Sequence, residues 1–185
     1  MKKTVFVAIL MLFSMTAKNG VQQVSLLELE ADLLERLLEE QAAQGYQNLM
    51  DEIGMSESSG RVDVVNQIGA IGKYQFMPRT LEDLGLLIRP DEFAEDPSLF
   101  PEAVQDSIML EHLKRNEQYL QEIIVQYEGD TLECGTIVTR AGILAAAHLA
   151  GCYGVERYFK EGYNPQDING TSILTYLNKF QKVAL

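Results

Sequence analysis

The 185-residue sequence is poor in the residue types that several classes of protein depend on. Two cysteines are too few for the framework of a disulfide-rich mini-fold. Only 15 basic residues stand against 27 acidic ones, and the resulting net charge of −12 opposes the phosphate neutralisation that nucleic-acid binding requires. These shortages exclude a disulfide scaffold and a DNA- or RNA-binding protein.

Histidine is also scarce, with His112 and His148 falling on different predicted helices. The sequence has no His-Glu-x-x-His motif and no paired-cysteine spacing of the kind that binds zinc. We therefore expect no metal site and no cofactor.

Long apolar runs are missing, apart from a short one near the start of the chain. Residues 1–3 supply a basic region, residues 5–13 an apolar run, and residues 15–17 end on Ala17, which is the pattern of a secretory signal. The run is shorter than the roughly 20 residues of a membrane span. We expect residues 1–17 to be a signal peptide, with an uncleaved anchor as the alternative. The protein is then exported to the periplasm or beyond the cell, and touches the membrane only through this segment.

The remaining chain has the periodicity of helices. Leucines follow one face of residues 24–43 with acids opposite, which predicts an amphipathic helix that packs on its own domain or binds a partner protein. Gly45 is expected to end this helix, and a second helix is expected from residue 46 to about 56. The predicted organisation is a signal peptide at 1–17, an N-terminal amphipathic helix at 18–45 and a catalytic domain at 46–185.

Further along, residues 89–97 read as a loop and residues 61–77 as a small β element, because valines and isoleucines there alternate with turn formers. The other segments have helical spacing. Helices are predicted at 78–84, from about 101 to 128, at 137–150, at 155–159 and at 172–183, the last capped by Thr171. The fold class is mainly α, one domain, with a small β element near residues 61–77.

Cys134 and Cys152 flank the apolar helix predicted at 137–150. A helix of that length separates its ends by about 20 Å. Bridged cysteines have Cα atoms within about 7 Å of each other. Helix geometry therefore argues against a disulfide between them.

Glu57 is the first candidate for chemistry. It follows Ile53 by four residues and so continues the apolar stripe of the helix predicted at 46–56. Burial and the negative end of a helix dipole both favour the protonated form of a carboxylic acid, as a general acid needs. The alternative is that Glu57 turns outward where the helix ends.

The segment after Glu57 has features of a carbohydrate cleft. Gly69 and Gly72 allow the backbone to approach a ligand closely, Tyr74 offers a flat face and Gln75 an amide. Amides and aromatic faces suit sugar hydroxyls and sugar rings. This stretch therefore favours a polysaccharide as ligand.

Three motifs in order resemble the lysozyme-like lytic transglycosylases of bacteria, over residues 49–159. That family has Glu-Ser, then Gly-Leu-Met-Gln with a following Met-Pro-x-Thr, then Ala-Tyr-Asn-Ala-Gly. The corresponding segments here are Glu57-Ser58, the stretch GAIGKYQFMPRT at 69–80, and LAAAHLAG at 144–151 followed by VERY at 155–158. The chain departs from the family at Lys73-Tyr74, in place of Leu-Met, and at His148-Leu149, in place of Tyr-Asn.

The resemblance implies a lysozyme-like fold and a peptidoglycan substrate. It makes Glu57 the acid that protonates the oxygen between N-acetylmuramic acid and N-acetylglucosamine. It makes Ser58, Tyr74, Gln75 and His148 substrate-binding residues. For His148, a core or surface histidine is the alternative.

In a lytic transglycosylase the muramyl 6-hydroxyl then attacks its own anomeric carbon and forms a 1,6-anhydro product. A hydrolase needs a second carboxylate, for which Asp63 is the nearby candidate. The absence of a clear second acid favours the transglycosylase. A non-catalytic cell-wall binding or assembly protein on the same fold is the remaining alternative.

Overall fold

The computed structural model describes residues 20–164, 166 and 170–185. The predicted signal peptide at 1–17 lies outside this part of the chain, as do residues 18–19, 165 and 167–169. Helices account for most of the described residues, which confirms the mainly α class. None of the helices described combines the length and the apolar character that a membrane crossing demands.

The chain divides between residues 43 and 44 into two units. Helix α2 (Gly20–Ser58) runs from the first unit into the second. In the first unit, leucines of the amphipathic stripe have about half of their surface exposed, namely Leu27, Leu29, Leu33, Leu34, Leu37 and Leu38.

The prediction that Gly45 ends a helix is wrong, because α2 continues through it. Gly45 is buried, and a Cβ atom there would lie 2.9 Å from the Cα of Leu185. This glycine therefore provides space for the end of the chain rather than a stop for the helix.

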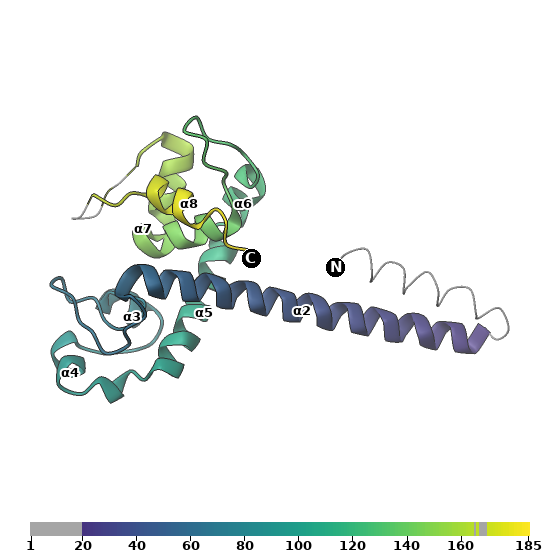
Figure 1. Cartoon of the computed structure of the whole chain (residues 1–185), viewed down its shortest axis with the longest axis horizontal. Helices are drawn as coiled ribbons and strands as arrows, with labels where there is room; N and C mark the ends of the chain where they lie inside the picture. Colours follow the sequence, from purple (N-terminus) through teal and green to yellow (C-terminus); the bar gives the residue numbers. More distant parts are fainter. Residues whose placement is uncertain (1–19, 165, 167–169) are drawn as a thin grey trace. The chain divides into compact units, whose positions relative to one another are not determined.

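The larger unit consists of short and medium helices, which Figure 1 labels: α3 (Pro78–Asp83), α4 (Pro90–Glu95), the 3-10 helix η1 (Pro97–Leu99), α5 (Glu102–Tyr119), α6 (Gln121–Tyr127), α7 (Arg140–Glu161) and α8 (Ile173–Phe180). The loop predicted at 89–97 is wrong, since α4 and η1 lie there. Both begin with a proline, whose fixed φ suits the first helical position. The long helix predicted from residue 101 is divided at Leu120, between α5 and α6.

Helix α7 joins the two helices that the sequence predicts at 137–150 and 155–159. Gly151 lies between them with φ 72° and ψ 161°, which is not helical. At α8 the predicted cap is wrong by one residue: Ser172, not Thr171, accepts a hydrogen bond from the Thr175 amide.

The β content consists of isolated bridges in the part of the chain described. Val65 pairs with Ile71, and Ile71 with Phe76, inside the segment where the sequence predicts a small β element. Further bridges join Thr131 to Ile137 and Gln166 to Ser172.

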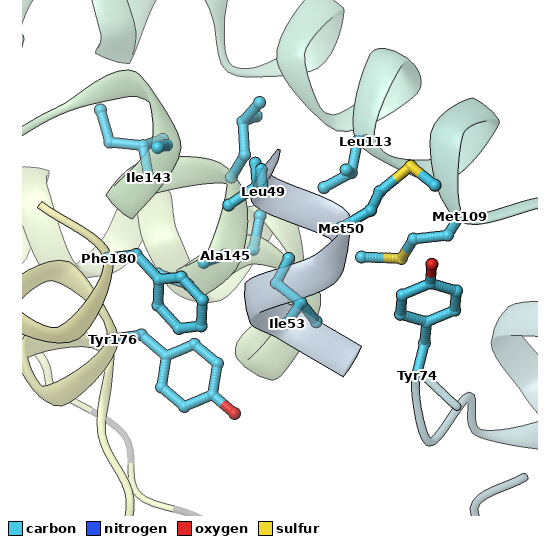
Figure 2. Close-up of a cluster of buried hydrophobic side chains, with 14 of the residues drawn as sticks. Leu49, Met50, Ile53, Tyr74, Met109, Leu113, Ile143, Ala145, Tyr176 and Phe180 are labelled. Atoms are coloured by element: carbon cyan, nitrogen blue, oxygen red, sulfur yellow. The ribbon is translucent and has the colours of Figure 1, made fainter. Parts of the chain in front are cut away.

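The core of the larger unit surrounds the C-terminal part of α2. Leu49, Met50 and Ile53 of α2 lie among buried side chains of α5, α7 and α8 (Figure 2). Tyr176 and Phe180 of α8 lie beside each other on this side of the core, with ring centroids 5.3 Å apart. The end of α2, which carries Glu57, is therefore held from several sides.

Cys134 and Cys152 are both free cysteines, as the helix geometry predicts.

Candidate active site

A cavity of about 780 Å³ opens at the C-terminal end of α2. This volume is within the range of pockets that bind small molecules or sugar units. Its walls come from the end of α2, the segment before and at the start of α3, the middle of α7, and α8 with the residue preceding its cap. The lining residues are Ser56, Glu57, Asn66, Gln67, Ile68, Ala70, Gln75, Phe76, Met77, Thr80, His148, Leu149, Thr171, Thr175, Tyr176 and Lys179.

Glu57 is half-buried in the last turn of α2 and lines this cavity. The Tyr176 hydroxyl donates a hydrogen bond to its Oε1 atom. Tyr176 is buried in α8, so its own position is fixed by packing. Sequence reasoning missed Tyr176, because nothing local connects it with a residue 119 positions earlier.

The described lining contains one carboxylate, that of Glu57, and one lysine or arginine, Lys179. Asp63, the predicted second acid, is exposed and does not line the cavity. The cavity as described therefore offers one acid for proton transfer, not a pair.

Gln75 lines the cavity as predicted, in a backbone conformation that few residues adopt. Its φ is 52°, in the left-handed region, and its side-chain amide donates to the Gly72 carbonyl at 2.8 Å. Gly72 has φ 74°, and a Cβ there would lie 2.3 Å from Oε1 of Gln105. Only glycine fits at this position.

Gln105 fixes the backbone behind Gln75, although it does not touch the cavity. Its Oε1 atom accepts from the Lys73 amide at 2.6 Å, and its Nε2 atom donates to the carbonyls of Val62 and Phe100 at 2.8 and 2.7 Å. It is 1% exposed, so these bonds replace water that it has lost. The sequence does not predict that Gln105 bonds this backbone, because a single glutamine within a helix is not a motif.

Asn66 stabilises the stretch of the cavity wall formed by residues 66–70. Its side-chain oxygen accepts from the amides of Ile68 and Ala70, both at 2.9 Å. An asparagine that bonds nearby backbone in this way stabilises a tight turn. The segment from 66 to 70 is thus held by its own first residue.

Two predicted substrate contacts are not found on the cavity wall. The Tyr74 ring is fully buried, and its hydroxyl donates to Asp106 at 2.6 Å. Ser58 is also buried, and its hydroxyl donates to the Lys73 carbonyl at 2.8 Å. Both side chains support the wall from behind, because the turn at 72–75 directs Tyr74 into the core and Gln75 toward the cavity.

The charges behind the wall are paired. Lys73 contacts Asp106 at 3.0 Å and Glu102 at 3.3 Å. Burial alone would lower the pKa of Lys73, but the two carboxylates outweigh it and the pKa is raised. Burial, and then the bond to Asp106, raises the pKa of Tyr74 well above its usual range. Tyr74 is therefore a neutral hydrogen-bond donor.

His148 lines the cavity near the middle of α7, and its Nε2 atom donates to the Tyr74 carbonyl at 2.8 Å. The rings of Phe76 and His112 each meet it edge-on, with centroids 5.4 Å away. Burial lowers the pKa of His148, although Glu57 and the Tyr74 carbonyl favour its charged form. A neutral ring donating from Nε2 leaves Nδ1 as an acceptor, and Nδ1 is buried without a hydrogen-bond partner among the described residues.

The described part of the chain contains no group of three or more histidine, cysteine or acidic side chains arranged to hold a metal ion. When the chain was compared with known protein families, curated proteins and solved structures, nothing matched. The case for a function therefore rests on the motifs and on the chemistry of the cavity.

Proposed function

We propose that this chain is an exported enzyme that cleaves the glycosidic bond between N-acetylmuramic acid and N-acetylglucosamine in peptidoglycan, on a lysozyme-like fold. The observation that carries the proposal is that residues of all three motifs line one cavity. Glu57 comes from the first, Gln75 from the second and His148 from the third. Glu57 and Gln75 match the family's motifs at this cavity, and His148 occupies it at a position where the chain departs from the third motif.

Glu57 is the proton donor in this proposal. A neutral Glu57 gives its proton to the glycosidic oxygen as the bond from that oxygen to the muramyl anomeric carbon breaks. The muramyl 6-hydroxyl attacks the same carbon and gives its proton to the Glu57 carboxylate, which regenerates the acid. The products are a 1,6-anhydromuramyl end and a free N-acetylglucosamine 4-hydroxyl.

A transglycosylase is favoured over a hydrolase because this route needs one carboxylate. The described lining has only Glu57, and Asp63 is exposed away from it. A hydrolase that used Asp63 would need that side chain to reach the cavity.

The polar wall suits a sugar polymer. Asn66, Gln67, Gln75, Thr80 and Thr175 contribute amide and hydroxyl groups to the cavity. Such groups can donate and accept hydrogen bonds with sugar hydroxyls and acetamido groups. The departures from the family at Lys73 and Tyr74 do not line the cavity, whereas those at His148 and Leu149 do and change the groups that face the substrate there.

The proposal is tested by clearing of a suspension of purified peptidoglycan. We expect wild-type protein to clear it and Glu57→Gln to lose at least a hundredfold in rate, since general acid catalysis contributes about that much. Glu52→Gln is the matched control, because Glu52 is exposed on the same helix and does not line the cavity. Equal clearing by wild type and Glu57→Gln would contradict the assignment. Binding of peptidoglycan without clearing would indicate a non-catalytic wall-binding protein instead.

A further inference from the structure

Lys179 stands apart from the other residues of the cavity. It is the one lysine or arginine of the described lining in a chain with a net charge of −12. Its Nζ atom donates to the Ser56 hydroxyl at 2.5 Å. Ser56 directly precedes Glu57, and Tyr176, one turn earlier on α8, donates to Glu57. The same face of α8 thus holds the acid through Tyr176 and bonds the residue before it through Lys179.

No carboxylate among the described residues forms an ion pair with Lys179. Most other basic side chains of the larger unit do have such partners, including Lys73, Arg79, Arg89, Arg115, Arg140, Arg157 and Lys160. The Ser56 hydroxyl that Lys179 contacts is neutral, so it does not balance the positive charge of the ammonium group. A ligand that complements this charge carries an anionic group.

We infer that Lys179 binds a carboxylate on the muramyl side of the substrate. The inference rests on the proposed function. N-acetylmuramic acid carries a lactyl ether on C3 of the ring whose C1 reacts, so its carboxyl carbon lies within a sugar ring's width of the bond that Glu57 protonates. In glycan without stem peptides this group is a free carboxylate, and in glycan with stem peptides the carboxylates belong to the peptide. N-acetylglucosamine has neither.

Lys179 thereby distinguishes muramyl from glucosaminyl units beside the scissile bond. Lys179 is exposed to solvent. The ion pair between its ammonium group and the substrate carboxylate therefore changes affinity only a few-fold, and added salt weakens it. Hydrogen bonds to the neutral parts of the glycan provide the rest of the affinity.

The test measures binding by calorimetry in a Glu57→Gln background, which prevents turnover. The ligands are a peptide-free tetrasaccharide of alternating N-acetylglucosamine and N-acetylmuramic acid, the same tetrasaccharide with stem peptides, and chitotetraose. Lys179→Met, Lys179→Arg and Lys182→Met are compared with the parent. Lys182 is exposed just after α8 and does not line the cavity.

We expect Lys179→Met to weaken binding of a muramyl ligand by about two- to fivefold at low salt and to leave chitotetraose unchanged. Lys179→Arg should bind the muramyl ligands as tightly as the parent does, because it keeps the positive charge. Lys182→Met should bind all three ligands as the parent does. A loss confined to the peptide-free ligand identifies the lactyl carboxylate, and a loss confined to the peptide-bearing ligand identifies the stem peptide.

An equal loss for all three ligands, or no loss for any, overturns the inference and leaves the proposed function standing. Failure of the parent protein to bind any of the three ligands overturns both. Thermal unfolding of Lys179→Met at the parent temperature shows that a loss of binding is not a loss of fold.

Discussion

At the scale of single residues, Glu57 depends on a partner that is far away in the sequence. Tyr176 donates to one of its oxygens, and Tyr176 is itself held by the core around α8. A carboxyl group fixed in one rotamer is ready to meet the glycosidic oxygen, whereas a free one must be ordered as the reaction proceeds. Tyr176 is thus a positioning residue for the proposed acid.

Removing that hydroxyl should lower activity without unfolding the protein. For Tyr176→Phe we expect kcat/KM on peptidoglycan fragments to fall about tenfold, the effect of losing one hydrogen bond to a carboxylate. Tyr119→Phe is the control, because the Tyr119 hydroxyl bonds Glu156 away from the cavity. Full activity in Tyr176→Phe, at an unchanged Tm, would show that Tyr176 has no such role.

A second residue-scale feature is the pair of histidines, in which His148 lines the cavity and His112 packs against it. Burial, with further contributions from His148 and Arg115, lowers the pKa of His112 to about 3. Burial also lowers the pKa of His148. Their rings meet edge-on with centroids 5.4 Å apart, so protonating either one places a charge in the core.

These shifts predict a loss of stability in acid. The unfolded chain takes up protons at both histidines as pH falls below about 6.5, whereas the folded pKa of each is lower, that of His112 being about 3. Each histidine therefore contributes stability that is complete above pH ~6.5 and decreases as pH falls, by at most about 1.4 kcal/mol per pH unit.

The measurement is urea unfolding between pH 8 and 5 for wild type and His112→Gln. Glutamine cannot titrate but can still accept the hydrogen bond that Asn116 donates to His112. The free energy of unfolding of the variant should decrease less steeply below pH 6.5. Parallel curves for the two proteins would contradict the account.

At the scale of elements, α2 is the support of the proposed site. Its C-terminal part lies in the core among α5, α7 and α8 (Figure 2). Its last turn carries Ser56 and Glu57 to the cavity. Gly45 lets the end of the chain pack closely against this part of α2. The glycine costs about 1 kcal/mol of helix propensity relative to alanine, which the close packing must offset.

Gly45→Ala separates these two effects. In the full chain we expect a loss of about 1–3 kcal/mol in the free energy of unfolding, because the new Cβ would lie 2.9 Å from the Leu185 Cα atom. In a chain that lacks residues 184 and 185, the same substitution should stabilise by up to about 1 kcal/mol. Chemical denaturation of the four proteins measures both changes. Stabilisation of the full chain would mean that the contact is absent.

The elements that the sequence predicted correctly are those with a strong local signal. The apolar residues of α7 and the proline at the start of α3 place helices where the structure has them. Gly45 and the prolines of α4 and η1 misled the prediction because each has two meanings. Glycine can end a helix or permit close packing, and proline can mark a loop or begin a helix. Only tertiary contacts decide between them.

At the scale of the whole molecule, the cavity is assembled from segments that span most of the larger unit. Glu57, Gln75 and His148 could be predicted because each lies in a motif of neighbouring residues. Tyr176, Lys179 and Gln105 could not, since their roles arise from contacts across 119, 123 and 32 positions. The sequence wrongly predicts Tyr74 at the cavity because it does not show the left-handed backbone at Gln75, which sends the two neighbouring side chains to different sides of the wall.

The central claim is that Glu57 cleaves glycan strands without water. Mass spectrometry of fragments released from purified peptidoglycan tests it most directly. The account predicts 1,6-anhydromuramyl ends with wild-type protein and no new ends with Glu57→Gln. Reducing muramyl ends from the wild type, or the same fragments from Glu57→Gln, would contradict it.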